Sequence, residues 1–193
     1  MNTTGKKIKL SIDDGCASDV RLAKLAEKYE IETIFYWPVE MVSLALYKGY
    51  KPLTFFEARD IAKSHEIGSH TITHRHLTKI SDIEAREEIY YSKFLLEDMF
   101  GVKVKKFAPP RGYTTEELTN YTLDHYEEQR LTKGSYLVHI HPSSGANNNV
   151  DWVDAINENT TEIWGHGWEI DKYDEWGRLE EVLSAITHSK SLA

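Results

Sequence analysis

Segments with two different patterns of hydrophobic and polar residues alternate along this chain. Short runs rich in branched and aromatic residues, such as TIFYW, are typical of buried strands, and apolar residues spaced three or four apart are typical of amphipathic helices. The predicted strands cover residues 7–12, 32–37, 66–70, 102–108, 135–140 and 160–164. The predicted helices cover residues 19–30, 54–65, 82–100, a segment opened by TTEE, 150–156 and 175–186. Strict alternation with short connections predicts parallel strands covered by helices.

Local signals mark where two of these helices begin and where one of them ends. Thr54 with Glu57, and Ser81 with Glu84, have the spacing of a capping box, in which each side chain bonds to the other residue's backbone. Gly101 follows the long helix, at the position where a left-handed residue commonly ends a helix. The helix over 82–100 therefore has a predicted signal at each end.

Side chains able to bind ions or move protons gather at the ends of the predicted strands. In parallel α/β folds this edge of the sheet carries the site, which is built from loops that follow different strands. The spacing of the elements alone leaves open whether the sheet closes into a barrel or stays an open, doubly wound sheet. The residues at or just past strand ends are Asp13, Asp14, His70, Arg111, His141 and His166.

Composition narrows the class of protein. The chain has 193 residues, of which 40% are hydrophobic, so residues 1–193 are expected to form a single domain with a buried core. Lys and Arg number 23 against 31 Asp and Glu, a formal net charge of -8, and the basic residues form no long run. This balance argues against nucleic acid or an anionic membrane surface as the main partner.

Cysteine count and hydropathy bear on the compartment. Cys16 is the only cysteine in the sequence, so no internal disulfide can form. The start of the chain, MNTTGKKIKL, leads into the first strand without the apolar stretch of a signal peptide, and no later stretch suits a membrane span. We therefore expect a soluble protein that stays where it is made, in the cytoplasm by default.

The motif HTITH places two histidines where both can reach one ion. His70 and His74 are four positions apart, and two neutral imidazoles with one carboxylate form a zinc ligand set that leaves a fourth position open for water. Of the adjacent acids Asp13 and Asp14, one can bind the cation while the other acts as a base on water. Gly15 behind them permits a tight backbone turn.

These motifs together resemble a known family. Asp13-Asp14-Gly15, His70-x-x-x-His74 and FAPPRGY resemble the first three motifs of the polysaccharide deacetylases, the NodB-homology domain of carbohydrate esterase family four. The segment EIWGHGWEI is similar to the last histidine motif of a short bacterial branch of that family. The resemblance extends from about residue 7 to the final helix. It implies a distorted (β/α) barrel with fewer than eight parallel strands.

The resemblance also implies a role for each residue of the first two motifs. Asp14, His70 and His74 would bind a divalent metal, usually zinc, and Asp13 would be the catalytic base. The metal in this family polarises the acetamide carbonyl and activates water.

A histidine on the far side of the substrate would protonate the leaving amine. His166 is favoured for this role, and His141 is the alternative. Trp164 and Trp168 flank His166 and are either packing residues or a stacking surface for a sugar. We expect His139 to face the side of its strand opposite His141 and to be structural.

The third motif departs from the family pattern. The family's arginine before the prolines, which orients the catalytic aspartate, is replaced by Ala108, and Arg111 follows the prolines instead. Arg111 either supplies the same charge from another position or faces the sugar. The tryptophan-bearing fourth motif of the longer enzymes is not visible between Tyr113 and Tyr136, which leaves the substrate groove unassigned.

The combined prediction is a metal-dependent de-N-acetylase that hydrolyses the acetamide of an N-acetylated carbohydrate to acetate and a free amine. The departures in the third and fourth motifs keep open a second hypothesis, a catalytically silent carbohydrate-binding or assembly protein on the same barrel. The same ligand set also suits a third, a metal-dependent hydrolase of another bond, such as a phosphoester. The oligomeric state stays open.

Overall fold

A computed structural model describes residues 8–134, 137–140 and 153–190 of the chain. Its strands form one sheet in the order β5-β4-β3-β2-β1-β7-β6, and every neighbouring pair is parallel. Four strands lie on one side of β1 and two on the other, because the chain adds β2 to β5 on one side and then β6 and β7 on the other. The strands are β1 (Lys9–Asp13), β2 (Thr33–Trp37), β3 (Glu66–Ser69), β4 (Lys106–Phe107), β5 (Glu128–Gln129), β6 (Leu137–His139) and β7 (Glu162–His166).

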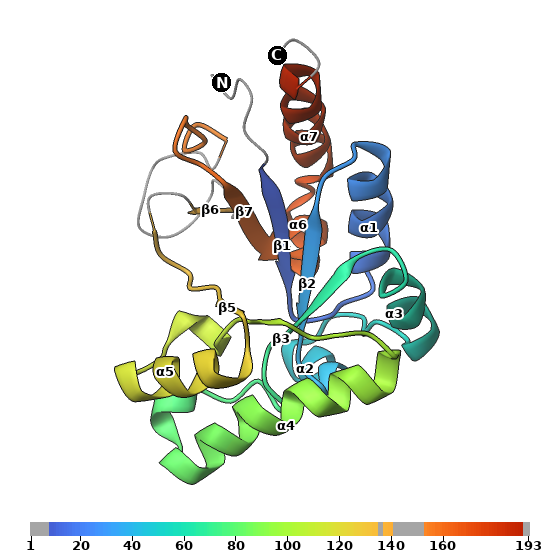
Figure 1. The fold of residues 1–193 in the computed structure, drawn as a ribbon. Helices are drawn as coiled ribbons and strands as arrows, with labels where there is room; N and C mark the ends of the chain where they lie inside the picture. The colour runs from blue at the N-terminus through green and yellow to red at the C-terminus, as the bar shows by residue number, and fades with distance from the viewer. Residues whose placement is uncertain (1–7, 135–136, 141–152, 191–193) are drawn as a thin grey trace.

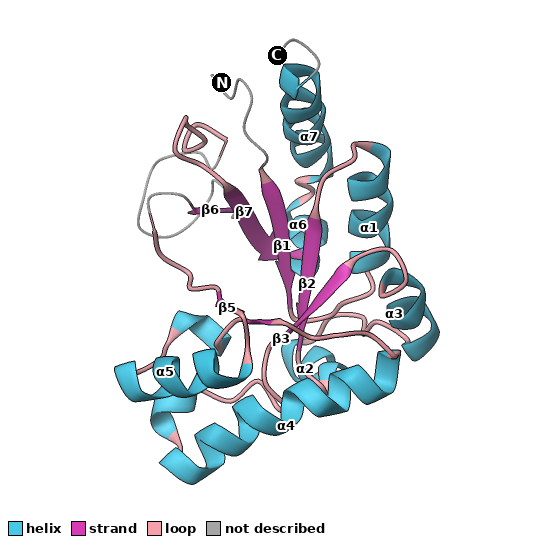
Figure 2. Cartoon of the chain, viewed as in Figure 1, coloured by secondary structure: helices cyan, strands magenta, loops and turns pink. Residues whose placement is uncertain are grey.

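Helices cover the outer side of this sheet. Figure 1 shows the sheet curling into a half-barrel, with α1, α3, α4 and α5 around its outside and β5 and β6 at its edges. This is the predicted distorted (β/α) barrel, and its seven strands are fewer than eight. The helices, cyan in Figure 2, are α1 (Asp19–Lys28), α2 (Met41–Lys48), α3 (Phe55–Ile61), α4 (Asp82–Phe100), α5 (Glu116–His125), α6 (Gly167–Tyr173) and α7 (Trp176–Lys190).

The two faces of the sheet have different compositions, because side chains alternate along each strand. Leu10 and Ile12 of β1 and Phe35 of β2 belong to the large hydrophobic core that the helices complete. The alternate residues of β1 lie on the other, concave face, where Ser11 donates a hydrogen bond to Glu162 of β7. Ser11 and Glu162 are thus paired across neighbouring strands, below the strand ends that carry the site.

The elements agree with the sequence pattern where local signals exist. Every predicted strand is present with shifted bounds, and both capping boxes form, at Thr54 with Glu57 and at Ser81 with Glu84. Gly101 ends α4 with a φ of 69°, as its position predicts. Within the described ranges, no helix combines the length and the apolar character needed to cross a bilayer.

Three elements were not predicted, and one prediction is wrong. The segment taken as a loop contains α2, whose sequence MVSLALYK is apolar on its exposed side as well and so shows no clear period. Strand β5 has only two residues, and α6 begins directly at the end of β7. Residues 153–155 form a turn where a helix was expected over 150–156, and residues 150–152 lie outside the described part.

Candidate active site

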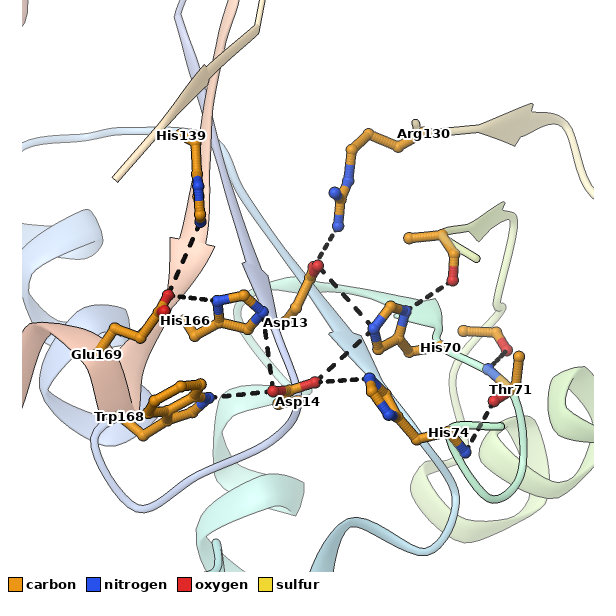
Figure 3. A network of polar contacts seen from close by, with 12 residues as sticks. Asp13, Asp14, His70, Thr71, His74, Arg130, His139, His166, Trp168 and Glu169 are labelled. Carbon is orange, nitrogen blue, oxygen red and sulfur yellow. Dashed lines mark hydrogen bonds and ion pairs between the residues drawn. The ribbon is translucent and has the colours of Figure 1, made fainter. Parts of the chain in front are cut away.

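Five strands bring polar side chains to one edge of the sheet. Asp13, His139 and His166 are the last residues of β1, β6 and β7, and His70 and Arg130 directly follow β3 and β5. Because all the strands are parallel, these ends lie at the same edge. Figure 3 shows the side chains pointing toward a common centre between the strands. The cluster of polar side chains predicted at the strand ends is therefore present, although some of its residues differ from those predicted.

Asp14, His70 and His74 lie together in the arrangement of a metal site. Their candidate ligand atoms are all within 4.8 Å of one another. Asp14 Oδ1 lies 3.1 Å from Nε2 of His74 and 3.8 Å from Nε2 of His70. Asp14 is fully buried, and its Oδ1 accepts no hydrogen bond from any described residue. A buried carboxylate oxygen without a donor, facing two imidazole nitrogens, is the environment that a divalent cation completes.

The second oxygen of Asp14 is held by donors. Oδ2 accepts hydrogen bonds from Nε1 of Trp168 at 3.0 Å and from Nζ of Lys48 at 2.7 Å. Burial by itself would raise the pKa of Asp14, but His166, His74 and Lys48 hold that pKa well below its usual value. Asp14 therefore stays ionised, with one oxygen fixed by donors and the other directed at the histidines.

A backbone carbonyl fixes the orientation of His70. Its Nδ1 donates a hydrogen bond to the carbonyl oxygen of Ala108 at 2.7 Å, which leaves Nε2 as the nitrogen that faces Asp14. Burial lowers the pKa of His70 to about 4, so the ring is neutral near pH 7 and its Nε2 can serve as a ligand. The third motif thus supports the metal site through the main chain of Ala108.

The HTITH segment forms a loop, neither a helix nor a strand. Thr71 and His74 both have positive φ, 74° and 58°. The hydroxyl of Thr71 accepts a hydrogen bond from the backbone N–H of His74 at 3.0 Å. This turn folds the loop back after β3 and brings the ring of His74 to 4.9 Å from that of His70, measured between centroids.

The other acid of the pair, Asp13, forms a buried ion pair with Arg130. The guanidinium also lies over the rings of Tyr36 and Trp164, at 4.9 and 5.0 Å from their centroids. Burial alone would lower the pKa of Arg130, but Asp13 raises that pKa above its usual value. The guanidinium of Arg130 therefore stays positively charged. Asp13 Oδ2 is 4.0 Å from Nε2 of His70, so this acid borders the metal site.

The sequence suggested, as one of two alternatives, that Arg111 places a positive charge beside Asp13. In the structure Arg130 places that charge. Arg111 is exposed in the turn after β4, with a φ of 62°, and lines the cavity above the site. No pattern indicated Arg130, because β5, the strand that positions it, is too short to recognise. It lies in the interval after Tyr113 where the sequence shows no fourth motif.

His166 faces Asp14 from the opposite side of the site. Its Nε2 is 3.8 Å from Asp14 Oδ2, and its Nδ1 is 2.6 Å from Oε2 of Glu169, one turn into α6. Burial would lower the pKa of His166, but Asp14 and Glu169 raise it above its usual value. Burial would raise the pKa of Glu169, but His139 and His166 lower it to about 2. Glu169 was not predicted, although its spacing of three residues from His166 at a helix start is a usable signal.

His139 was expected to face the side of its strand opposite His141 and to be structural, and the structure places its ring beside the site. Its Nε2 lies 3.8 Å from Glu169, and its ring stacks on Trp164 with centroids 3.9 Å apart. Residues two apart on a strand point to the same face, so the premise that His139 and His141 face opposite sides was mistaken. His141 itself lies outside the described residues.

A cavity of about 480 Å³ opens above these groups. Asp13, His70, His74 and His166 lie in its wall together with Lys48, Arg111 and Trp164. The ring of Trp168 lies outside this wall and stacks on Tyr50 with centroids 5.6 Å apart. The volume suits a small polar ligand.

The fold and the site define a class of protein, a parallel α/β half-barrel with an Asp-His-His cluster at the carboxyl ends of its strands. The family model described as polysaccharide deacetylase matches residues 1–129 of the chain. The chain therefore belongs to the polysaccharide deacetylase family. The family is generally metal-dependent, which agrees with the Asp-His-His cluster. A search of curated proteins finds no match.

Solved structures share the fold at low sequence identity. A family 4 carbohydrate esterase from Streptomyces lividans, in complex with acetate, is 16% identical with a TM-score of 0.71, over 96% of this chain and 91% of that one. The peptidoglycan deacetylase PdaC from Bacillus subtilis is 18% identical with a TM-score of 0.68, over 96% and 86%.

A pseudoenzyme of carbohydrate esterase family 4, from Bacillus anthracis, is also similar. It is 18% identical with a TM-score of 0.63, over 90% of this chain. This chain covers 62% of the pseudoenzyme's length, so it spans less than two thirds of that protein. The shared fold therefore occurs both with and without activity.

Proposed function

We propose that this protein is a metal-dependent de-N-acetylase that acts on an N-acetylated carbohydrate. The observation that carries the proposal is the buried Oδ1 of Asp14, which accepts no hydrogen bond in the described structure and faces Nε2 of both His70 and His74. Membership of the polysaccharide deacetylase family supports the reaction type.

Asp14, His70 and His74 would hold the metal ion, and their donor set suits zinc with a further position open to substrate. When bound, the ion supplies Lewis acidity that polarises the acetamide carbonyl and makes water a stronger acid. The residues around it prepare the ligands: Ala108 orients His70, and Trp168 holds Asp14.

Asp13 takes the proton from the water molecule that attacks the acetamide carbon. Its carboxyl group borders the metal site on the side of His70, and it lines the cavity. Arg130 fixes one carboxyl oxygen, so that the other is positioned for proton transfer. Arg111, in the cavity wall, is proposed to contact the substrate.

His166 donates a proton to the amide nitrogen as the C–N bond breaks, which releases a neutral amine and acetic acid; the acid then loses its proton to water to give acetate. Glu169 holds Nδ1 of His166, so Nε2 is the nitrogen left for the substrate side. The carboxylate of Glu169 beside Nδ1 favours the protonated ring that a general acid requires. His141 remains the alternative acid from the sequence.

Two observations favour a second candidate, a catalytically silent carbohydrate-binding protein. A pseudoenzyme is among the structures with the same fold, and this chain has Ala108 where the family carries an arginine. Arg130 argues against a catalytically silent protein, because its buried guanidinium pairs with Asp13 in place of the arginine that the third motif lacks. Sugar binding without acetate release by metal-loaded protein would favour this candidate.

The test is an acetate-release assay over N-acetylated monosaccharides, chitin oligomers and peptidoglycan fragments, with and without a chelator. Zinc-loaded protein should release acetate from at least one substrate, and the chelator should stop it. The variant His74→Ala should lose metal and activity. His76→Ala is the matched control, because His76 lies in the same loop but outside the Asp14-His70-His74 group.

Three results would contradict the proposal. They are a purified protein that binds no divalent ion, acetate release that His74→Ala leaves unchanged, and phosphate release from an aryl phosphate in place of acetate release. The last result would favour the hydrolase of another bond.

A further inference from the structure

A second cavity lies beside the metal site, on the other side of Trp168. Its volume is about 420 Å³, and it is formed by the loop after β1, the loop after α2 and the helix α6. Its wall includes Ser18, Tyr50, Lys51, Trp168, Asp171 and Lys172. The proposed reaction uses none of these side chains except Trp168, which holds Asp14.

Trp168 connects the second cavity to the metal site. Its Nε1 donates to Asp14 Oδ2 at 3.0 Å, and its ring stacks on Tyr50 at an interplanar angle of 6°. Nζ of Lys48, which also contacts Asp14, lies 5.2 Å from the centroid of the same ring. A ligand in the second cavity would therefore lie one side chain, that of Trp168, away from Asp14.

The charges in the second cavity favour an anion. Lys51 and Lys172 form no ion pair with a carboxylate in the part of the chain that the structure describes. The carboxylate in the wall, Asp171, accepts hydrogen bonds from the hydroxyl of Ser18 and from Nε1 of Trp176, which are uncharged donors and leave its charge in place. The two lysines therefore exceed it by one positive charge. Both lysines are exposed at the cavity wall, where Nζ of Lys172 also lies 5.0 Å from the ring centroid of Tyr173. Neither ammonium group is therefore neutralised by a carboxylate, and both can attract an anion.

The wall also contains a polar atom without a partner. The hydroxyl oxygen of Tyr50 is buried and has no hydrogen-bond partner among the described residues. Such groups are rare in folded proteins, and a bound molecule or an ordered water commonly completes them. The ring of Tyr50, stacked on Trp168, adds the flat apolar surface that sugar-binding sites use beside polar groups.

We propose that the second cavity binds an acidic substituent, a carboxylate or a phosphate, attached to the N-acetylated sugar or to the unit next to it. This inference rests on the proposed function, since it names the substrate class of the same site. The ammonium groups of Lys51 and Lys172 supply charge-assisted hydrogen bonds to the anion. The preferred substrate is then an acidic oligosaccharide or glycosyl phosphate, and a neutral chitin oligomer is a poorer one.

Three substrates separate the possibilities. They are an oligosaccharide of alternating N-acetylglucosamine and glucuronic acid, a neutral chitin oligomer of equal length, and N-acetylglucosamine 1-phosphate. The measured quantity is kcat/KM for acetate release by zinc-loaded protein. In the double variant Lys51→Glu/Lys172→Glu, the ratio of acidic to neutral kcat/KM should fall about tenfold or more. Lys24→Glu, an exposed lysine on α1, is the control for charge and should keep the ratio.

A binding measurement keeps this inference separate from the reaction. Calorimetric titration of the Asp13→Asn protein with each substrate reports affinity without turnover. Weaker binding of an acidic ligand by the double lysine variant supports the anion site even where no acetate is released, and then only the proposed reaction fails. Equal kcat/KM on acidic and neutral substrates, or an equal loss on both in the double variant, overturns the inference. The uronic acid and phosphate arms show which anion is preferred.

Discussion

The guanidinium of Arg130 forms an ion pair with the carboxylate of Asp13, 117 positions earlier in the chain. Both side chains are almost completely buried, at 2% and 3% exposure. The pair joins β5, at one edge of the sheet, to the interior strand β1. It gives the proposed base a fixed orientation that the third motif, with Ala108 in place of arginine, does not provide.

Replacing Arg130 by glutamine should lower kcat for acetate release by about a hundredfold, because the base loses its orientation. The free energy of unfolding should fall by about 3–5 kcal/mol, because a buried carboxylate loses its partner. Metal content should stay near that of the wild type. Arg130→Lys should recover part of kcat, and Arg111→Gln should cost less than Arg130→Gln. A larger loss in Arg111→Gln would show that Arg111 orients Asp13.

The two adjacent acids should respond differently to amide substitution. Asp13→Asn should remove most acetate release and leave the bound zinc nearly unchanged, because only proton transfer is lost. Asp14→Asn should lower the zinc content, because Asp14 Oδ1 faces both histidines. Metal analysis of dialysed protein, read beside the assay, checks both. Loss of zinc in Asp13→Asn, with zinc kept in Asp14→Asn, would mean that the two roles are exchanged.

Asp19 should make the protein less stable as the pH rises. Its carboxylate is fully buried, accepts hydrogen bonds from Trp37 and Cys16, and burial raises its pKa to about 7. Because the folded state holds this proton more tightly than the unfolded state, the stabilisation is complete below about pH 4 and is lost as the pH rises through about 7.

The variant Asp19→Asn carries no charge, so it should gain on the wild type between pH 5 and pH 8. The gain should approach about 4 kcal/mol at most. Urea unfolding at several pH values measures it. Asp60→Asn is the control, because Asp60 is exposed beside Lys63 and its pKa is lowered by that lysine. A difference between Asp19→Asn and wild type that does not change with pH would contradict the prediction.

Gly68 should not tolerate a side chain. A Cβ at this position in β3 would lie 2.4 Å from a ring carbon of Tyr36, which is itself buried. Gly68→Ala should therefore lower the free energy of unfolding by about 1–3 kcal/mol, through overpacking next to the site. Gly177→Ala is the matched substitution, because nothing lies within 4 Å of its Cβ position in α7. It should leave Tm unchanged or raise it, since alanine favours a helix by up to about 1 kcal/mol. Equal Tm values for the two variants would contradict this account.

Much of the fold was predictable because its signals are local. The capping boxes at Thr54 and Ser81 and the left-handed Gly101 depend on neighbours within a few residues, and all three form as expected. Strand β5 and helix α2 were missed for the opposite reason. A two-residue strand has no period of its own and exists only through its pairing with β4, and α2 is apolar on both sides.

The sequence by itself determined that Asp14, His70 and His74 belong together, because DDG and HTITH carry their chemistry within a few residues and each follows a strand of a parallel sheet. Only the tertiary structure decided what surrounds them. Arg130 reaches Asp13 across four strand pairings, and the carbonyl of Ala108 reaches His70 from the next strand. Such partners depend on strand order and register, which long-range packing sets and which no short motif records.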